Sequence, residues 1–231
     1  MWQNKRSTDL EILDLGPDHY TMTEYSECLT LLGRINQWLG GFAATQRAFK
    51  RLKNMPKSIL EVGCGGGYLC KKIAHWLPHA TITGIDINST AVKEAQKLFN
   101  VQKDKVSIET QDGKTLKYMD NQFDVVTTML VCHHMNDQEL VNFLKESYRI
   151  CSSAVIINDL QRHFLAYASF SMIASFAFPN RLIWHDGRLS IKRGFHKQDW
   201  INILKMAGFH NGQYELRWNW AFRWTLTIKK T

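Results

Sequence analysis

The sequence of 231 residues has no C-x-x-C pair, and its five cysteines are widely spaced. An odd number of cysteines in this arrangement argues against a disulfide framework or a zinc site, so we predict reduced thiols and no metal centre. The first residues, Met1–Arg6, lack the apolar core of a signal peptide. Together these absences predict a cytoplasmic protein.

The sequence also lacks a hydrophobic run long enough for a membrane span. The uncharged stretch Phe164–Phe178 has 15 residues. As a helix it would be roughly 22 Å long, against about 30 Å of hydrocarbon in a bilayer. We therefore interpret it as a cap helix that follows a strand.

Basic runs with interleaved aromatic residues are absent too, although the formal net charge is +8. Charge alone supports only nonspecific attraction to polyanions. Because the lysines and arginines are scattered, we do not expect a nucleic-acid partner. A solvated basic face, or peripheral contact with an acidic membrane surface, accounts better for the charge.

What the chain does contain is an alternation of strand and helix patterns. Strands are predicted at Ser58–Val62, Ala80–Asp86, Val106–Thr110, Phe123–Thr128, Ala154–Asn158, Asn211–Arg217 and Trp220–Lys229. Helices are predicted at Tyr68–Trp76, from Asn88 or Ser89 to Phe99, at Asp137–Ile150 with Asp137 as its cap, and at His196–Ala207. The alternation predicts an α/β fold, namely a Rossmann-like, doubly wound, mostly parallel sheet of seven strands with an antiparallel C-terminal strand.

We expect a single domain over residues 1–231, with a helical N-terminal extension over 1–55 and a cap insertion over 160–195. Within the extension, residues 1–20 are interpreted as an arm. Two helices are expected between Thr23 and Lys53, separated at Gly40-Gly41.

Glycine is concentrated directly after the first predicted strand, in Glu61-Val62-Gly63-Cys64-Gly65-Gly66-Gly67. A glycine-rich turn between a strand and a helix lets backbone N–H groups approach a nucleotide-like ligand. Asp86 ends the second strand, and Asp112 follows the third. Ligands bind at the carboxyl ends of strands in an open α/β sheet, where Asp86 can accept both hydroxyl protons of a ribose and Asp112 can meet an adenine amino group.

The turn reads G-x-G-x-G rather than G-x-G-x-x-G, and with Glu61 before it the stretch resembles motif I of class I S-adenosylmethionine-dependent methyltransferases. Asp86 and Asp112 match that family's acidic residues on the ribose and adenine sides, and Phe123–Val126 with the following turn matches its motif IV. The resemblance covers residues 57–158. It implies S-adenosylmethionine as cofactor, bound by Glu61, Gly63, Cys64, Gly65, Gly67, Asp86, Ile87, Asp112, Gly113 and Leu130.

Motif IV continues as Leu130-Val131-Cys132-His133-His134-Met135, which resembles the paired-histidine form of small-molecule methyltransferases. His133 or His134 could orient an acceptor or take a phenolic proton, since imidazole titrates near neutral pH. The alternative is that both cap the next helix. His163 and His185, which flank the cap insertion, are further candidates for the base.

The segments Leu39–Phe42, Asn158–His163 and His185–Ser190 resemble bacterial methyltransferases associated with type III polyketide synthases, which implies phenolic or pyrone acceptors. The aromatic and methionine content of Phe164–Phe178 independently suits a pocket for a lipophilic ligand, or burial against the N-terminal helices. We therefore predict an enzyme that methylates a small, largely apolar acceptor, most simply on oxygen in a phenolic, quinone or polyketide-type compound. The alternatives are an RNA or protein methyltransferase that uses the basic surface, and a catalytically silent cofactor-binding partner protein.

Overall fold

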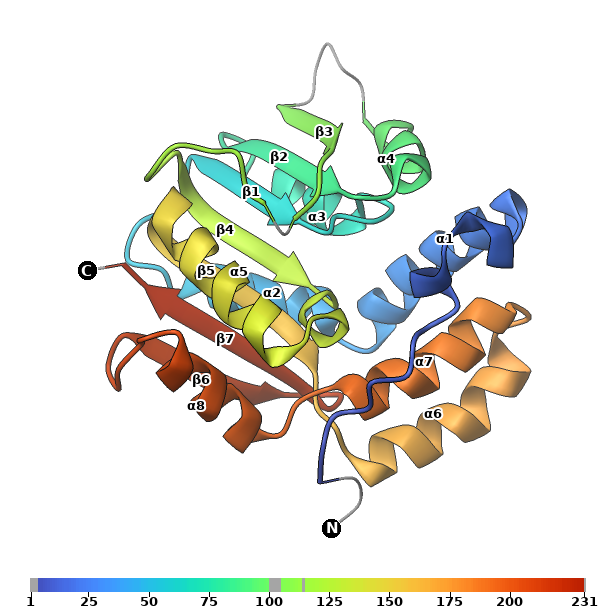
Figure 1. Ribbon diagram of the computed structural model, residues 1–231. Coiled ribbons are helices and arrows are strands. Elements are labelled where there is room, and N and C mark those ends of the chain that lie inside the picture. The colour runs from blue at the N-terminus through green and yellow to red at the C-terminus, as the bar shows by residue number, and fades with distance from the viewer. Residues whose placement is uncertain (1–3, 100–104, 114, 231) are drawn as a thin grey trace.

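The computed structural model describes residues 4–99, 105–113 and 115–230, and within them the chain forms one mixed seven-stranded sheet in the order β3-β2-β1-β4-β5-β7-β6 (Figure 1). β7 runs antiparallel to both of its neighbours, and the other strands share one direction. The strands are β1 Ser58–Val62, β2 Thr81–Asp86, β3 Val106–Thr110, β4 Phe123–Met129, β5 Cys151–Leu160, β6 Tyr214–Asn219 and β7 Arg223–Lys229. The predicted fold class is confirmed.

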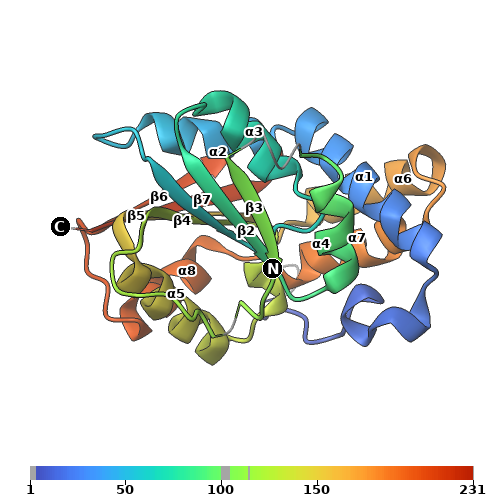
Figure 2. The same cartoon turned by 90° about the horizontal axis from the view of Figure 1, so that it is seen from above.

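Helices cover both faces of the sheet, as the view from above shows (Figure 2). One face packs against α2 Gly41–Lys50, α3 Tyr68–Trp76 and α4 Ser89–Gln96, and the other against α5 Asp137–Ile150 and α8 Lys197–Met206. The central strands are buried on both faces and are accordingly rich in apolar residues: β1 carries Ile59 and Leu60, both fully buried, one in each core.

The remaining helices gather beyond one end of the sheet (Figure 1). They are α1 Met22–Trp38, α6 Phe164–Ala177 and α7 Arg181–Arg193. Tyr25, Cys28 and Leu29 of α1 share an apolar cluster with Leu182 and Ile183 of α7. Helix α1 of the N-terminal extension and the helices of the cap insertion, far apart in sequence, therefore form one helical layer over the carboxyl ends of the parallel strands.

The N-terminal arm runs along α7 before α1 begins (Figure 1). It contains two short 3₁₀ turns, η1 Leu13–Leu15 and η2 Pro17–His19. The Ser7 N–H donates to the Lys192 carbonyl at 3.2 Å, and the carboxylate of Asp186 accepts from the N–H groups of Ile12 and Leu13 at 2.9 and 3.1 Å. Residues that we interpreted only as an arm are thus fixed against the cap.

Several predicted boundaries were wrong. Asn136, not Asp137, caps α5, because its extended backbone lets the side chain accept from the Glu139 N–H at 2.9 Å. β7 begins at Arg223 rather than Trp220, since residues 220–222 form the turn after β6. The helix α7 was not predicted.

No helix within the described ranges is long and apolar enough to cross a bilayer, and all five cysteines are free and buried.

Candidate active site

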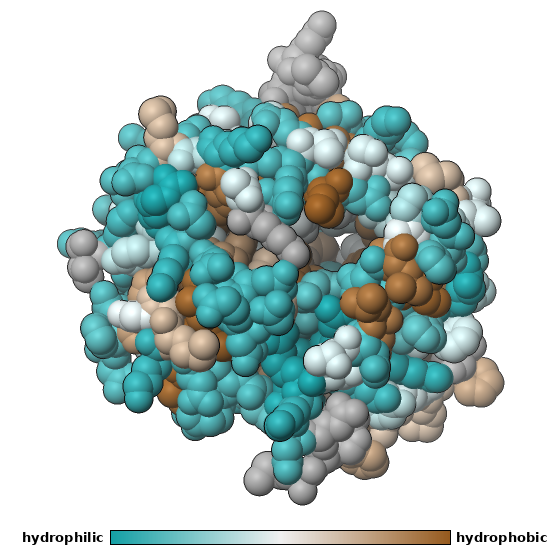
Figure 3. Space-filling model, in the orientation of Figure 1, coloured by the Kyte–Doolittle hydropathy of each residue, from teal (hydrophilic) through white to brown (hydrophobic). Residues whose placement is uncertain are grey.

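A cavity of about 720 Å³ opens at the carboxyl ends of β1, β2 and β4, beneath α1. Figure 3 shows this face of the molecule hollowed near its centre, with apolar side chains beside the hollow. Nine of the ten predicted cofactor residues line the cavity together: Glu61, Gly63, Cys64, Gly65, Asp86, Ile87, Asp112, Gly113 and Leu130. The tenth, Gly67, is not part of the wall; it precedes α3, and a Cβ there would meet the Ala95 Cβ at 2.9 Å. We therefore assign Gly67 a packing role.

Gly63 is required by the fold of the turn itself. Its φ is +70°, and an added Cβ would lie 2.4 Å from Cγ2 of Val131. The glycine thus lets the turn after β1 pack directly on the turn after β4, which brings motif I and the histidine segment into one site.

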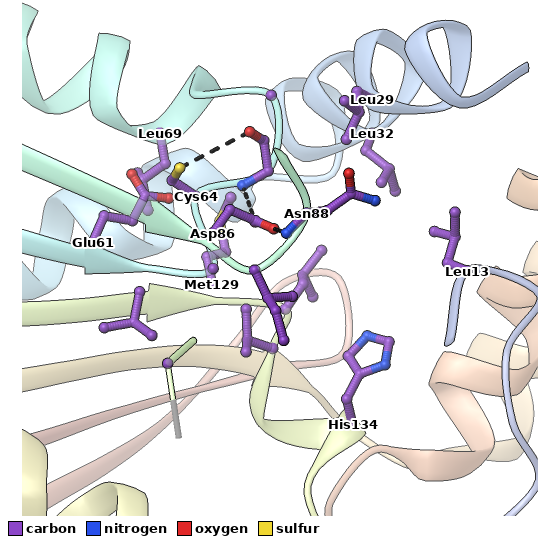
Figure 4. Close-up of a pocket in the computed structure, with 18 of the residues that line it drawn as sticks. Leu13, Leu29, Leu32, Glu61, Cys64, Leu69, Asp86, Asn88, Met129 and His134 are labelled. Carbon is purple, nitrogen blue, oxygen red and sulfur yellow. Dashed lines mark hydrogen bonds between the residues drawn. The ribbon is translucent and has the colours of Figure 1, made fainter. Parts of the chain in front are cut away.

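Asp86 ties the glycine-rich turn to the end of β2 (Figure 4). Its carboxylate accepts from the Gly65 N–H at 2.8 Å and from the Asn88 N–H at 2.9 Å. Burial raises the pKa of Asp86, and these two hydrogen bonds act against the increase. Since a carboxylate has about four lone-pair positions, Asp86 can accept further hydrogen bonds from a ligand.

Glu61 lies deeper in the same cavity (Figure 4). Its side chain is 2% exposed, and one of its oxygens, Oε2, has no hydrogen-bond partner among the described residues. Burial raises the pKa of Glu61 to about 8, and the nearby charge of Asp86 adds to the effect. A buried carboxyl oxygen without a donor is costly unless something supplies one.

A second cavity of about 510 Å³ adjoins the first. It lies between α1, α6 and α7, and the turn after β6 contributes Trp220, Ala221 and Phe222 to its wall. Most of its lining is apolar. Four residues line both cavities: Leu13, Leu32, Leu130 and His134.

The predicted histidine pair lies at this junction, on the 3₁₀ turn η3 Cys132–His134. His133 is buried, with Nδ1 at 2.7 Å from Oδ1 of Asp159, whose other oxygen accepts from the His133 backbone N–H at 3.2 Å. Burial alone would raise the pKa of Asp159, but the His133 ring reverses that and keeps it below its ordinary value. Asp159 thereby fixes the ring with its proton on Nδ1.

His134 is more accessible and points toward the first cavity (Figure 4). Its Nδ1 lies 2.8 Å from Oδ1 of Asp14, a residue of the arm that also pairs with Arg193 of α7. The pKa of Asp14 is lowered despite its burial because of these two partners. In both histidines, therefore, Nδ1 faces a carboxylate, and Nε2 is the ring nitrogen that can interact with a bound ligand.

Glu11 is the residue that the sequence did not predict. It comes from the arm and lines the second cavity, yet it is only 3% exposed. Its Oε1 accepts from the Ser190 hydroxyl at 2.8 Å, and burial raises its pKa to about 7. The one available signal was the apolar content of residues 10–15, in which Glu11 and Asp14 stand among four leucine and isoleucine residues, because an exposed arm does not need so many apolar side chains.

The structure does not bring His163 and His185 to the junction. His163 caps α6, where its Nδ1 accepts from the Leu165 N–H at 3.1 Å, and its ring stacks on Phe222. His185 is about half exposed on α7 and pairs with Asp186 at 2.8 Å. Neither lines either cavity, so of the four predicted bases only the adjacent pair lies where donor and acceptor would meet.

Comparison with known proteins agrees with this geometry. Residues 59–154 match a family described as a methyltransferase domain. An ajmaline N-methyltransferase from Rauvolfia serpentina is 34% identical over 104 residues, which is 44% of this chain and 35% of that protein. A ubiquinone biosynthesis O-methyltransferase from Coxiella burnetii is 26% identical over 124 residues, 53% of this chain and 51% of that protein. The chain thus spans about a third to a half of the length of these curated relatives.

Solved structures match over nearly the whole chain. A plantazolicin methyltransferase in complex with SAH superposes with a TM-score of 0.70 at 17% identity, covering 93% of this chain and 91% of that one. A SAM-dependent methyltransferase from Aquifex aeolicus gives a TM-score of 0.66 at 15% identity, covering 91% and 98%. At these identities the likeness describes the fold, and the alternation of strands and helices had already predicted it.

Proposed function

We propose that this chain, a class I S-adenosylmethionine-dependent methyltransferase by its domain and its fold, transfers a methyl group to an oxygen atom of a small, largely apolar acceptor. The observation that carries the proposal is the pair of adjoining cavities, the first containing Glu61, Asp86 and Asp112 and the second mainly apolar, with Glu11 and two histidines beside their junction. S-adenosylmethionine is the methyl donor.

The residues of the first cavity fit this cofactor. The unpartnered Oε2 of Glu61 is suited to the ammonium group, and Asp86 has acceptor capacity left for the ribose hydroxyls. Exposed Ile87 and the nearby Asp112 form the wall for an adenine ring. The cofactor carries no pyrophosphate, which agrees with acidic rather than basic side chains at these positions.

The second cavity supports a small acceptor. A volume of about 510 Å³ is in the range of pockets that bind drug-sized molecules, and the wall offers mainly apolar surface. A mainly apolar pocket of this size suits neither an RNA strand nor a protein side chain on a large surface. It suits the phenolic, quinone or polyketide-type compounds that the sequence predicted.

The junction favours oxygen as the methylated atom. A neutral amine needs no base before it attacks a methyl group, whereas a hydroxyl group must lose a proton. When bound, the cofactor supplies a methyl group on a sulfonium, and the acceptor oxygen forms the new C–O bond while the S–C electron pair returns to sulfur. Glu11, His133 and His134 are placed to hold the acceptor oxygen and promote loss of its proton, and alignment of acceptor and donor supplies the rest of the rate.

We also propose that a lipophilic acceptor reaches this cavity from a membrane surface through peripheral contact. Side chains of α6 are strongly exposed although apolar, including Leu165, Met172 and Phe176, and Ile173 of the same helix lines the cavity. The net charge of +8 would assist contact with an acidic bilayer.

A direct test uses purified protein, isotope-labelled S-adenosylmethionine and a panel of small phenols, quinones and fatty acids, with label transfer followed by mass spectrometry. We expect transfer to at least one apolar hydroxyl compound, and a loss of at least tenfold in His134→Ala. Methylation of RNA or protein with a steep salt dependence, and no small-molecule product, would contradict the proposal. Cofactor binding without transfer to any acceptor would favour the silent partner protein instead.

A further inference from the structure

Three potential metal ligands converge at the junction of the two cavities: Glu11, His133 and His134. Each offers one ligand atom, and these atoms all lie within 4.8 Å of one another. Nε2 of His133 is 3.6 Å from Oε1 of Glu11, and Nε2 of His134 is 3.9 Å from Oε2. Both separations are longer than a hydrogen bond.

The separations are close to those of ligands that share one ion. In a tetrahedral site with Zn–N distances near 2.0–2.1 Å, neighbouring ligand atoms are about 3.3 Å apart. The two separations involve different oxygens of Glu11 and exceed this value by about 0.3 and 0.6 Å. Since one atom from each residue falls within 4.8 Å of the others, side-chain rotations would have to draw the three together around an ion. Two imidazole nitrogens and one carboxylate oxygen, with a fourth position open, is also the ligand set of catalytic zinc sites.

The surroundings of the histidines strengthen this interpretation. Metal-binding histidines almost always donate their second ring N–H to a carboxylate or carbonyl, which fixes the ring and raises its basicity. Here both do so, His133 to Asp159 at 2.7 Å and His134 to Asp14 at 2.8 Å. Because Nδ1 of each ring donates to a carboxylate, the lone pair of each ring is on Nε2, and both Nε2 atoms face Glu11.

The third ligand is held in place independently of the other two. Ser190 donates to the Glu11 carboxylate, and the neighbouring residues Ile12 and Leu13 are bound through their N–H groups by Asp186. Glu11 and His133 are each 3% exposed. A carboxylate and an imidazole fixed at this depth form a prepared site rather than a loose surface cluster.

We propose that Glu11, His133 and His134 bind one divalent transition-metal ion, of which Zn²⁺ best suits two imidazoles and one carboxylate, with its open position toward the apolar cavity. The role of the ion rests on the proposed function: the acceptor hydroxyl coordinates to it, loses its proton to water, and attacks the methyl group as an oxyanion. The prediction of no metal centre relied on cysteine spacing, and it did not consider an arm residue that joins two histidines.

The test begins with the 231-residue chain after treatment with a chelator. We expect one equivalent of Zn²⁺ by calorimetry, and a Co²⁺ complex with visible absorption typical of four-coordination. Glu11→Gln and His134→Ala should each weaken binding by at least tenfold. Matched controls are Glu27→Gln on α1 and His75→Ala on α3, both exposed and absent from the lining of either cavity, which should bind as the parent does.

Two outcomes separate this proposal from the proposed function. If the treated protein binds neither ion but still methylates an apolar acceptor, the metal site is wrong and the function stands. If the ion binds but no acceptor is methylated, the site is supported and the function is wrong. Should His134→Ala fold poorly by circular dichroism, the partly exposed Asp14→Asn serves instead, and its unchanged Zn²⁺ affinity would contradict the role of the outer carboxylates.

Discussion

At the scale of single residues, Asp86 and Glu61, two of the acidic residues that line the first cavity, differ in their hydrogen-bond partners. Asp86 is stabilised by two backbone N–H groups, whereas one buried oxygen of Glu61 has no hydrogen-bond partner within the described part of the chain. A bound cofactor would therefore affect these two side chains differently. At Asp86 it would add hydrogen bonds to those already present, whereas at Glu61 it would supply the donor that the buried oxygen lacks.

Asp86→Ala should weaken S-adenosylmethionine binding by tenfold or more in calorimetry, because it removes the proposed ribose acceptors. Asp86→Asn is the sharper variant. Its amide oxygen can still accept from the Gly65 N–H, which keeps the contact with the glycine-rich turn, while its NH2 group can accept neither from the Asn88 N–H nor from a ribose hydroxyl. Parent-like affinity in Asp86→Asn would contradict the proposed position of the ribose.

Glu61 should make stability depend on pH. Its pKa is about 8 in the folded protein against an ordinary 4.5, so between these values the folded state keeps a proton that the unfolded state has lost. The free energy of unfolding should therefore fall as pH rises through this window, by up to about 1.4 kcal/mol per pH unit.

Urea unfolding of the cofactor-free protein at pH 5.5 and 7.5 measures this effect. Glu61→Gln, which cannot ionise, should show a smaller loss between the two values. Equal pH dependence in both proteins would show that Glu61 does not keep its proton in the folded state.

At the scale of elements, the exposed face of α6 carries the proposed membrane contact. The double variant Met172→Gln with Phe176→Gln should reduce flotation with phosphatidylserine vesicles by several-fold, because Phe176 is 92% exposed and Met172 66%. Met206→Gln on α8 replaces an exposed methionine outside the cap and is the matched control. Equal flotation of the parent, the control and the double variant would contradict membrane contact through α6.

The strands and the helices on the sheet were predictable because their periodicity reflects burial on the sheet, a strong and local signal. The helix α7 was not, and Gly187 in its middle shows why. A Cβ at Gly187 would lie 2.4 Å from Cζ of Phe170, so this glycine allows α6 and α7 to pack closely. A glycine in mid-helix usually indicates a break, and only the tertiary contact explains it.

The residues of the candidate site were likewise only partly predictable from the sequence. The cofactor residues follow strand ends and could be placed from the order of the strands. Glu11 could not, because nothing near it in the sequence indicates that the arm folds back over the histidine pair. His163 and His185 had the right chemistry but lie on the outer parts of the cap.

At the scale of the whole molecule, Arg6 connects the arm to the rest of the site. Its guanidinium donates to the carbonyls of Met135 and Arg193 at 2.6 and 3.0 Å and pairs with Asp137 at 2.9 Å. Arg6→Ala should loosen the arm at a cost of about 1–3 kcal/mol and lower methyl transfer, since Glu11 depends on the arm.

Hydrogen exchange measures this directly: amides of residues 7–15 should exchange faster in Arg6→Ala while those of the sheet are unchanged. Lys5→Ala, which removes an exposed neighbouring charge, is the control. Unchanged exchange in the arm would show that Arg6 is not what fixes it.

The docking of the arm on α7 also constrains the order of events during synthesis. Glu11 is synthesised well before Asp186 and Ser190, which fix its position. The arm must therefore remain without these contacts until α7 has been made. A stalled chain ending before residue 180 could form strands β1 to β5 and still lack the contacts that place Glu11 beside the histidine pair.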